Sequence, residues 1–155
     1  MIVEGVYVFT APPAVVFEAL LDPGVIAKSM PGTKELVAVG PHDYRGKMMV
    51  GVGPVTAAEF DLRIVLTELT PPVGFLMSVD GTGRFGFTKG QARVSLEPDG
   101  TGTRMNYNAD LQVGGKIAAV GQRLLDVVSR AMLRTGLEAL GKEVEDRLRG
   151  VGGKA

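Results

Sequence analysis

The fold of this chain is decided by residues 111–149, which read LQVGGKIAAVGQRLLDVVSRAMLRTGLEALGKEVEDRLR. Apolar residues recur there at spacings of three and four, while charged residues fall largely on the other side, a pattern typical of an amphipathic helix. No proline follows Gly114-Gly115 before the end of the sequence. We therefore predict one long C-terminal helix, whose apolar face needs a broad surface to bury against.

The residues before this helix predict that surface. A first strand over 2–9 leads into two short helices, one ending before Asp22-Pro23 and a second over 25–30. Apolar and polar residues then alternate in six runs that turn residues separate. These runs cover 33–39, 44–52, 55–69, 73–81, 85–97 and 101–112.

Strands linked by short turns pair with their neighbours, and the last helix must cover their apolar face. We therefore predict an α+β helix-grip fold, in which a curved seven-stranded antiparallel sheet is wrapped around a long C-terminal helix, with two short helices after strand 1. Residues 1–149 form a single ligand-binding domain in this prediction, and 150–155 form a flexible tail.

Composition excludes several classes of function. The chain has no cysteine, which excludes disulfides, a thiol nucleophile and a zinc–thiolate site. Seventeen basic residues balance seventeen acidic ones, which argues against electrostatically driven binding of nucleic acid. No apolar run is long enough to span a membrane, and the N-terminus lacks a signal-peptide pattern. A cytoplasmic protein is expected.

Three motifs point toward chemistry that their context does not support. Residues 81–86, GTGRFG, match a dinucleotide fingerprint, but the next segment is a predicted strand rather than the helix that must receive the pyrophosphate. Gly115-Lys116 has Ile117 where a phosphate loop requires serine or threonine. His42, the only histidine, falls in a predicted turn and is expected to face solvent. Neither a metal nor a cofactor is expected.

Acidic residues alternate with apolar ones, which places Glu59, Asp61 and Asp110 on the wet face of the sheet. An acid–base pair inside the domain is therefore not expected. Asp80 lies near a strand end, where a register shift of one residue would turn it inward. A position on the rim or outer face is favoured for it.

Short strings through the chain resemble one protein family in their order and spacing. They are Asp22-Pro23, Met30-Pro31-Gly32, Tyr44-Arg45-Gly46, Val52-Gly53-Pro54-Val55, Glu68-Leu69-Thr70-Pro71-Pro72, Gly81-Thr82-Gly83, residues 103–110 and Val113-Gly114-Gly115-Lys116-Ile117. The resemblance is to the G-subunit family of molybdenum-type carbon monoxide dehydrogenases, within the START-like (SRPBCC) helix-grip superfamily. It covers the chain from Gly5 to about Leu140. Thr33 stands where such proteins often have cysteine.

The candidate ligand contacts are the apolar residues that alternation and helical spacing place on the inward faces. They are Met30, Met48, Val50, Phe60, Leu62, Ile64, Phe75, Met77, Val79, Met105, Tyr107, Ile117, Gly121, Leu124, Leu125 and Val128. A filled core is the alternative, and the residue pattern leaves both open. Flexible methionines, strand glycines and a small residue on the helix at Gly121 favour an adaptable pocket. Tyr107 is its one obvious polar group.

The leading hypothesis is a non-catalytic carrier that holds an apolar small molecule, such as a lipid or quinone, between sheet and helix. The resemblance implies service to a molybdenum hydroxylase of the carbon monoxide dehydrogenase type, in membrane recruitment, electron transfer or assembly. Peripheral association with the inner face of the membrane stays open. The alternatives are a polyketide cyclase- or hydrolase-like enzyme on the same fold and an interaction subunit with a filled core.

Overall fold

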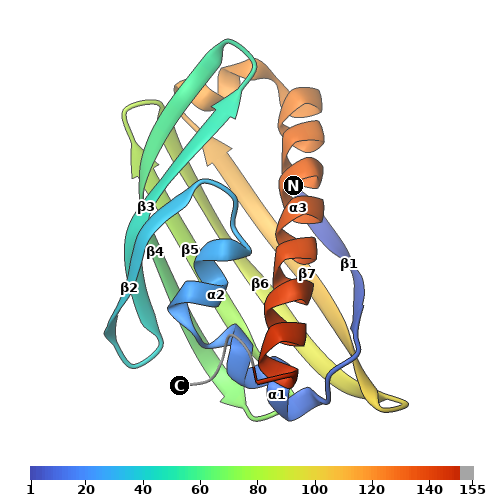
Figure 1. Cartoon of the computed structure of the whole chain (residues 1–155). Coiled ribbons are helices and arrows are strands. Elements are labelled where there is room, and N and C mark those ends of the chain that lie inside the picture. Colours follow the sequence, from blue (N-terminus) through green and yellow to red (C-terminus); the bar gives the residue numbers. More distant parts are fainter. Residues whose placement is uncertain (151–155) are drawn as a thin grey trace.

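The computed structural model describes residues 1–150 and confirms the predicted order of elements (Figure 1). The strands are β1 (Ile2–Phe9), β2 (Thr33–Gly40), β3 (Asp43–Val52), β4 (Val55–Thr70), β5 (Gly74–Gly83), β6 (Gly86–Asp99) and β7 (Gly102–Gly114). The helices are α1 (Pro13–Leu20), α2 (Pro23–Lys28), the 3-10 helix η1 (Lys116–Val120) and α3 (Gln122–Leu148). Of the tail predicted at 150–155, residues 151–155 lie outside the described part.

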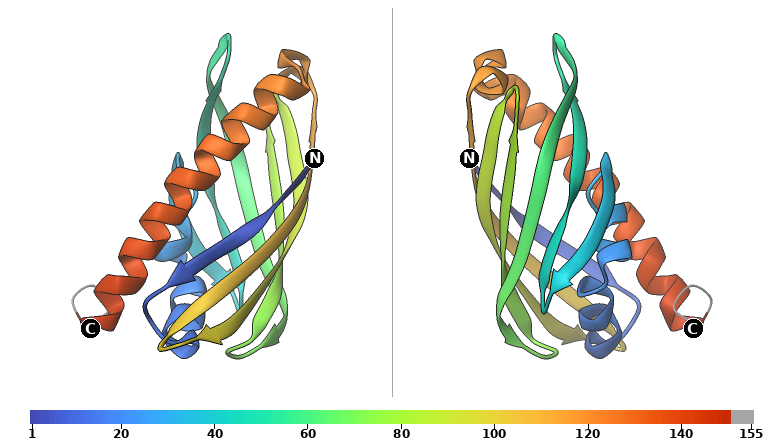
Figure 2. Two further views of the ribbon diagram at one scale, coloured as in Figure 1. Left: turned by 90° about the vertical axis from the view of Figure 1, so that its right-hand side faces the viewer. Right: turned by 90° about the vertical axis from the view of Figure 1, so that its left-hand side faces the viewer.

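All seven strands form one antiparallel sheet in the order β1-β7-β6-β5-β4-β3-β2. The strands from β2 to β7 each pair with their neighbour in sequence, as short turns require. The two short helices carry the chain from β1 at one edge of the sheet to β2 at the other. The sheet curves around α3, which crosses its inner face diagonally (Figure 2). The predicted helix-grip fold is confirmed.

Side-chain alternation assigns the two faces of the sheet. Along β4, Phe60, Leu62 and Ile64 are buried on the inner face, while Asp61 and Arg63 between them are exposed. Residues that lie directly opposite each other in an antiparallel pair share a face. The register of the sheet therefore extends this assignment from β4 to every strand.

Side-chain hydrogen bonds hold the short helices in place. The carboxylate of Asp22 caps α2 by accepting a hydrogen bond from the Gly24 N–H at 2.7 Å. Arg147 near the end of α3 donates to the same carboxylate. The Tyr44 hydroxyl donates to the Leu21 carbonyl at 2.6 Å. Asp22-Pro23 thus ends α1 as predicted and also begins α2, two residues earlier than expected.

The long helix is not continuous from Gly115, and this corrects the prediction for Gly121. After η1 the backbone breaks at Gly121, which has φ 102° and ψ 151° and caps α3 from outside the helix. A Cβ atom built on Gly121 would have no heavy atom within 4 Å. Glycine is therefore required there for its backbone conformation, and it does not make room on the apolar face of a helix.

Within residues 1–150, no helix has both the length and the apolarity needed to cross a membrane.

We expect Gly121→Ala to lower the free energy of unfolding by about 1–3 kcal/mol, because only glycine adopts this backbone region without strain. Urea denaturation measures the effect. Gly40→Ala is the matched control, since Gly40 has no positive φ and the nearest atom to its added Cβ is 3.8 Å away. The control should stay within about 0.5 kcal/mol of the native protein. Equal stability of both variants would contradict the backbone explanation.

Candidate functional site

Two separate clusters of apolar side chains pack on the inner face of the sheet. The first, called here the α1-side cluster, joins α1, α2 and the last turns of α3 to the sheet through Phe17, Ile64, Leu140 and Val144. The second, the η1-side cluster, is centred on Val52, Ala58, Phe60, Ile117 and Leu125. The apolar contacts between α3 and the inner face of the sheet are therefore concentrated near the two ends of the helix.

Between these clusters lie inner-face residues that neither cluster includes. Val3, Ala109 and Ala92 lie side by side on β1, β7 and β6, and Leu111 is the next inward residue of β7. All four are only half-buried although they point toward the helix side of the sheet. We call Val3, Ala92, Ala109 and Leu111 the inner patch. Because solvent still reaches it, α3 does not fill the space over this part of the sheet.

On α3, the apolar residue Met132 also lies outside both clusters. It follows Val128 of the η1-side cluster by one helical turn and precedes Gly136, which lies against the Ser29 carbonyl, by another. Met132 is half-buried and is not among the residues of either cluster. The structure thus leaves a weakly packed zone on both the sheet and the helix.

Fifteen of the sixteen predicted contacts lie in the two clusters, and Gly121 is the exception. Met30, Met48, Leu62, Ile64, Phe75, Met77, Val79, Met105 and Tyr107 belong to the α1-side cluster, and Val50, Phe60, Ile117, Leu124, Leu125 and Val128 belong to the η1-side cluster. The predicted ligand contacts thus belong to the two packed clusters on either side of the inner patch. From the sequence we also predict an enclosed pocket bounded by six of these residues, Phe60, Leu62, Met77, Tyr107, Leu124 and Val128, and this stays a prediction.

Sequence reasoning left the inner patch and Met132 out of the site. Ala109 and Leu111 follow Met105 and Tyr107 in strict alternation, so their inward direction was readable. Small side chains at Ala92 and Ala109 were the further signal, because an alanine pair on an inner face contributes little volume. What sequence could not show is that α3 leaves these two residues partly uncovered.

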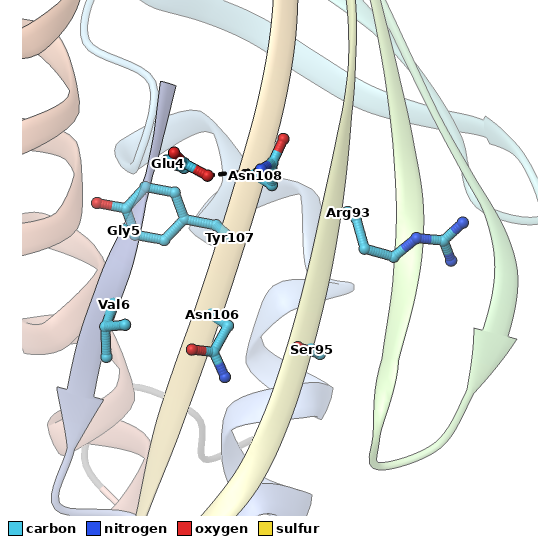
Figure 3. A pocket seen from close by; sticks show the side chains of 8 residues that line it. All are labelled: Glu4, Gly5, Val6, Arg93, Ser95, Asn106, Tyr107 and Asn108. Atoms are coloured by element: carbon cyan, nitrogen blue, oxygen red, sulfur yellow. Dashed lines mark hydrogen bonds between the residues drawn. The ribbon is translucent and has the colours of Figure 1, made fainter. Parts of the chain in front are cut away.

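Two hollows open on the surface, and both lie away from the inner patch. One of about 380 Å³ is lined by Glu4, Val6, Arg93, Asn108 and their neighbours from β1, β7 and β6 (Figure 3). Asn108 donates a hydrogen bond to Glu4 at 2.8 Å there. Tyr107 also borders this hollow, and its ring lies against Gly5.

The second hollow, of about 310 Å³, lies between β1 and the last turns of α3. Tyr7 and Phe9 line it from the strand and pack edge to face with ring centroids 5.0 Å apart. Glu138, Lys142 and Glu145 border it from the helix. It is a crease between an edge strand and its covering helix, and the Tyr7 hydroxyl lies against Gly141 there.

The charged side chains of the sheet lie on its outer face. Arg63 donates hydrogen bonds to Asp43 at 3.2 and 3.3 Å, and these bonds hold the pKa of Asp43 below its usual value. The hydrogen bond of Lys47 to Asp61 likewise raises the pKa of Lys47. Asp80 pairs in register with Arg63 and so also lies outside, as favoured by the sequence.

The remaining motifs have the structures expected from their context. Residues 81–86 form the β5–β6 hairpin, in which Gly83 lies opposite Gly86 and no helix follows. His42 lies in the β2–β3 turn with φ 57°, and its carbonyl accepts a hydrogen bond from the Leu66 N–H. The predictions of a hairpin and of a turn histidine are confirmed.

One inward polar group lacks a partner. Thr33 lies opposite Met48, which lies opposite Phe60, so the register places Thr33 on the inner face. Within the described chain, its hydroxyl oxygen is buried and makes no hydrogen bond. A buried polar group without a partner is costly, so this hydroxyl lowers the stability of the fold.

We expect Thr33→Val to leave the free energy of unfolding unchanged or to raise it, because valine replaces an unsatisfied hydroxyl by a methyl group. Thr103→Val is the matched control. The buried Thr103 hydroxyl donates to the Ala11 carbonyl at 2.7 Å, so its loss should cost about 1–3 kcal/mol. Chemical denaturation compares the two, and equal losses would show that Thr33 has a hydrogen-bond partner.

Comparison with known proteins agrees with this architecture. A conserved protein from Geobacillus kaustophilus is 27% identical, with a TM-score of 0.86 over 94% of this chain and 96% of that chain. The ZhuI aromatase/cyclase from Streptomyces sp. R1128 is 19% identical, with a TM-score of 0.71 over 99% and 98%. A START superfamily protein from Mycobacterium smegmatis is 15% identical, with a TM-score of 0.70 over 94% and 98%.

The last two likenesses, both under 25% identity, show the fold alone. The search of curated proteins found no match. The model of one family, the carbon monoxide dehydrogenase G-subunit (CoxG) family, matches residues 5–145. Since that match spans most of the sequence, the chain belongs to the CoxG family of carbon monoxide dehydrogenase subunits.

Proposed function

We propose that this protein is a non-catalytic carrier that binds an apolar small molecule between α3 and the inner face of the sheet. The family and the fold support a ligand-binding helix-grip protein. The observation that carries the proposal is the inner patch, whose four apolar residues point toward α3 and are still half-buried. Apolar surface left accessible inside a domain favours an apolar ligand.

The class of ligand follows from the side chains around this zone. Met48, Met77 and Met132 are flexible and polarisable, so they adapt to ligands of different outline. The hydroxyl of Tyr107, which lies on the inner face two residues before Ala109, offers a hydrogen bond to a polar head. A long apolar molecule with one oxygen-bearing end, such as a lipid or a quinone, fits this combination.

The absence of charge on the inner face favours a carrier over an enzyme. In the paired register of the described strands, no Asp, Glu, Lys, Arg or His lies on the inner face. General acid–base catalysis needs such groups within hydrogen-bonding reach of the substrate. The rival function, a cyclase- or hydrolase-like enzyme, would have to work with hydroxyl groups such as those of Tyr7, Tyr44 and Tyr107.

The partner we propose is a molybdenum hydroxylase of the carbon monoxide dehydrogenase type, working in the cytoplasm. Membership of the CoxG family supports this partner. A carrier would serve such an enzyme by moving a redox-active or lipidic molecule between it and the membrane, or during its assembly.

Native mass spectrometry after gentle purification, combined with lipid extraction, tests the carrier function. We expect the protein to retain an apolar molecule that organic solvent extracts. Protein that is fully ligand-free after such a preparation, and that also fails to bind an apolar probe dye, would contradict the carrier function and favour an interaction subunit with a filled core.

We expect Ala109→Leu to keep or raise the stability and to weaken dye binding, because leucine fills space over the inner patch. Ala58→Leu is the matched control: Ala58 is also an inner-face strand alanine but is 0% exposed in the η1-side cluster. Overpacking there should cost about 1–3 kcal/mol. Thermal unfolding and dye titration distinguish the two. Destabilisation of Ala109→Leu equal to that of the control, with unchanged dye binding, would contradict the site.

A further inference from the structure

The outer edge of β1 carries backbone groups that no other strand pairs. At its start, the Met1 ammonium donates to the Leu111 carbonyl at 2.9 Å, and the Leu111 N–H donates to the Met1 carbonyl at 2.8 Å. The register between β1 and β7 then continues without a shift to Phe9. Hydrogen-bonded residues alternate in an antiparallel pair. The odd-numbered residues of β1 therefore direct their N–H and C=O groups to β7, and the even-numbered residues, Ile2, Glu4, Val6 and Val8, direct theirs away from the sheet.

The two edges of the sheet differ in how they are protected. At the other edge, β2 has two register shifts against β3 and carries the adjacent charges of Lys34 and Glu35. Bulges and charged side chains of this kind keep further strands from adding to an edge. β1 has an unbroken register, no lysine and no proline, and Val6 and Val8 are 54% and 56% exposed. The β1 edge is therefore the one that is open to a further strand.

The hollow of about 310 Å³ between β1 and α3, called here the crease, lies along this open edge. Four consecutive residues, 7–10, line it from the strand side, and the side chains of a strand alternate between its two faces. The crease therefore runs beside β1, where α3 forms its other wall (Figure 2). Strand and helix meet where the Tyr7 hydroxyl lies against Gly141. An exposed sheet edge with side-chain pockets beside it is the geometry that binds an extended peptide as an added strand.

The helix wall of the crease favours a basic occupant. Glu138 and Glu145 are exposed there. Lys142, the one basic residue of the described chain that lines the crease, has its ammonium 3.3 Å from the Asp146 carboxylate. Within residues 1–150, Glu138 has no ion pair, and Glu145 has only an exposed one with Arg149 at 3.8 Å. Glu145 also stands in the last turn of α3, where the negative end of the helix dipole favours cations.

A second copy of this chain fits the crease less well than a basic peptide does. Its own open edge is β1, which contains Glu4 and no basic residue. Pairing of two β1 strands would therefore bring a further carboxylate to a wall that already has Glu138 and Glu145. Like charges placed next to each other in this way disfavour association, so the charge of the crease selects a different partner.

We propose that the crease binds an extended basic segment of a partner protein, which adds to the sheet as a strand beside β1. Every second residue of the segment exchanges backbone hydrogen bonds with Val6 and Val8 and places its side chain on the outer face. The residues between direct their side chains toward Tyr7 and α3, where lysine or arginine pairs with Glu138 and Glu145. This site is separate from the inner patch and needs no bound apolar ligand, so it goes beyond the carrier function.

Calorimetric titration of the full chain with the end-blocked probe peptide Thr-Lys-Thr-Val-Thr-Lys-Thr tests strand addition. Its threonines favour an extended strand, and its lysines fall on one side of that strand. N-methylation of the inner threonines removes the N–H groups that face Val6 and Val8, so we expect it to weaken binding about tenfold or more. N-methylation of the lysines is the matched control. Their N–H groups point away from β1, so binding should stay within about twofold.

Charge variants of the protein test the helix wall with the same peptide. We expect Glu138→Gln/Glu145→Gln to weaken binding about tenfold, because two exposed ion pairs are lost. Its melting temperature should stay level, since both side chains are exposed. Glu18→Gln/Glu59→Gln removes the same charge from exposed positions on α1 and β4, and it should bind within about twofold of the native protein.

Three outcomes would overturn the proposal. They are no binding of the basic peptide at about 1 mM, equal losses on methylation of the threonines and of the lysines, and equal losses in the two double variants. Sedimentation velocity adds a fourth: a dimer of the protein that the peptide dissociates would assign the crease to a second copy instead. A protein that retained no apolar molecule would leave the peptide results unaffected, so this proposal and the carrier function fail separately.

Discussion

One helix must cover a seven-stranded sheet, and the rest of the structure depends on that mismatch. Seven strands spaced about 4.8 Å apart span about 29 Å, whereas a helix with its side chains is about 10–12 Å wide. The sheet reduces the difference by curving around α3, and α1 and α2 cover one end of its inner face. The diagonal course of α3 leaves part of the inner face uncovered, and the half-buried side chains of the inner patch lie there. A binding zone is thus a direct result of the geometry of this fold.

The two clusters contribute unequally to the stability of the protein. The α1-side cluster contains most of the fully buried side chains, among them Phe17, Ile64 and Val144, and the Asp22–Arg147 ion pair lies beside it. The η1-side cluster is smaller and closes the other end through turns and a 3-10 helix. Segments with fewer buried contacts open at lower free energy than the core. We therefore expect a ligand to enter near η1, while the α1 side keeps the fold intact.

The sequence was sufficient for the strands and for the faces of the sheet, because both follow from a local period of two. It was insufficient at Gly121, where glycine fits two explanations: a small residue on a helical face and a residue with positive φ. The apolar spacing from Ile117 to Leu125 continues across the break, so periodicity alone could not reveal it. The inner patch was missed for another reason. Whether Ala92 and Ala109 are covered depends on the crossing angle of α3, which is set by contacts distant in sequence.

The polarity of the protein follows from its topology as much as from its composition. In an antiparallel meander, successive turns lie at alternate ends of the sheet. The segments around the β5–β6 turn and the β7–η1 connection carry only basic charges, while those around the β4–β5 and β6–β7 turns and α1 carry only acidic ones. The acidic side chains around α1 do not stay uncompensated, because Arg147, Arg93 and Arg104 pair with Asp22, Glu68 and Asp99. Topology thus places charges of one sign in each turn, and ion pairs with the adjoining strands and with α3 then balance the acidic turns.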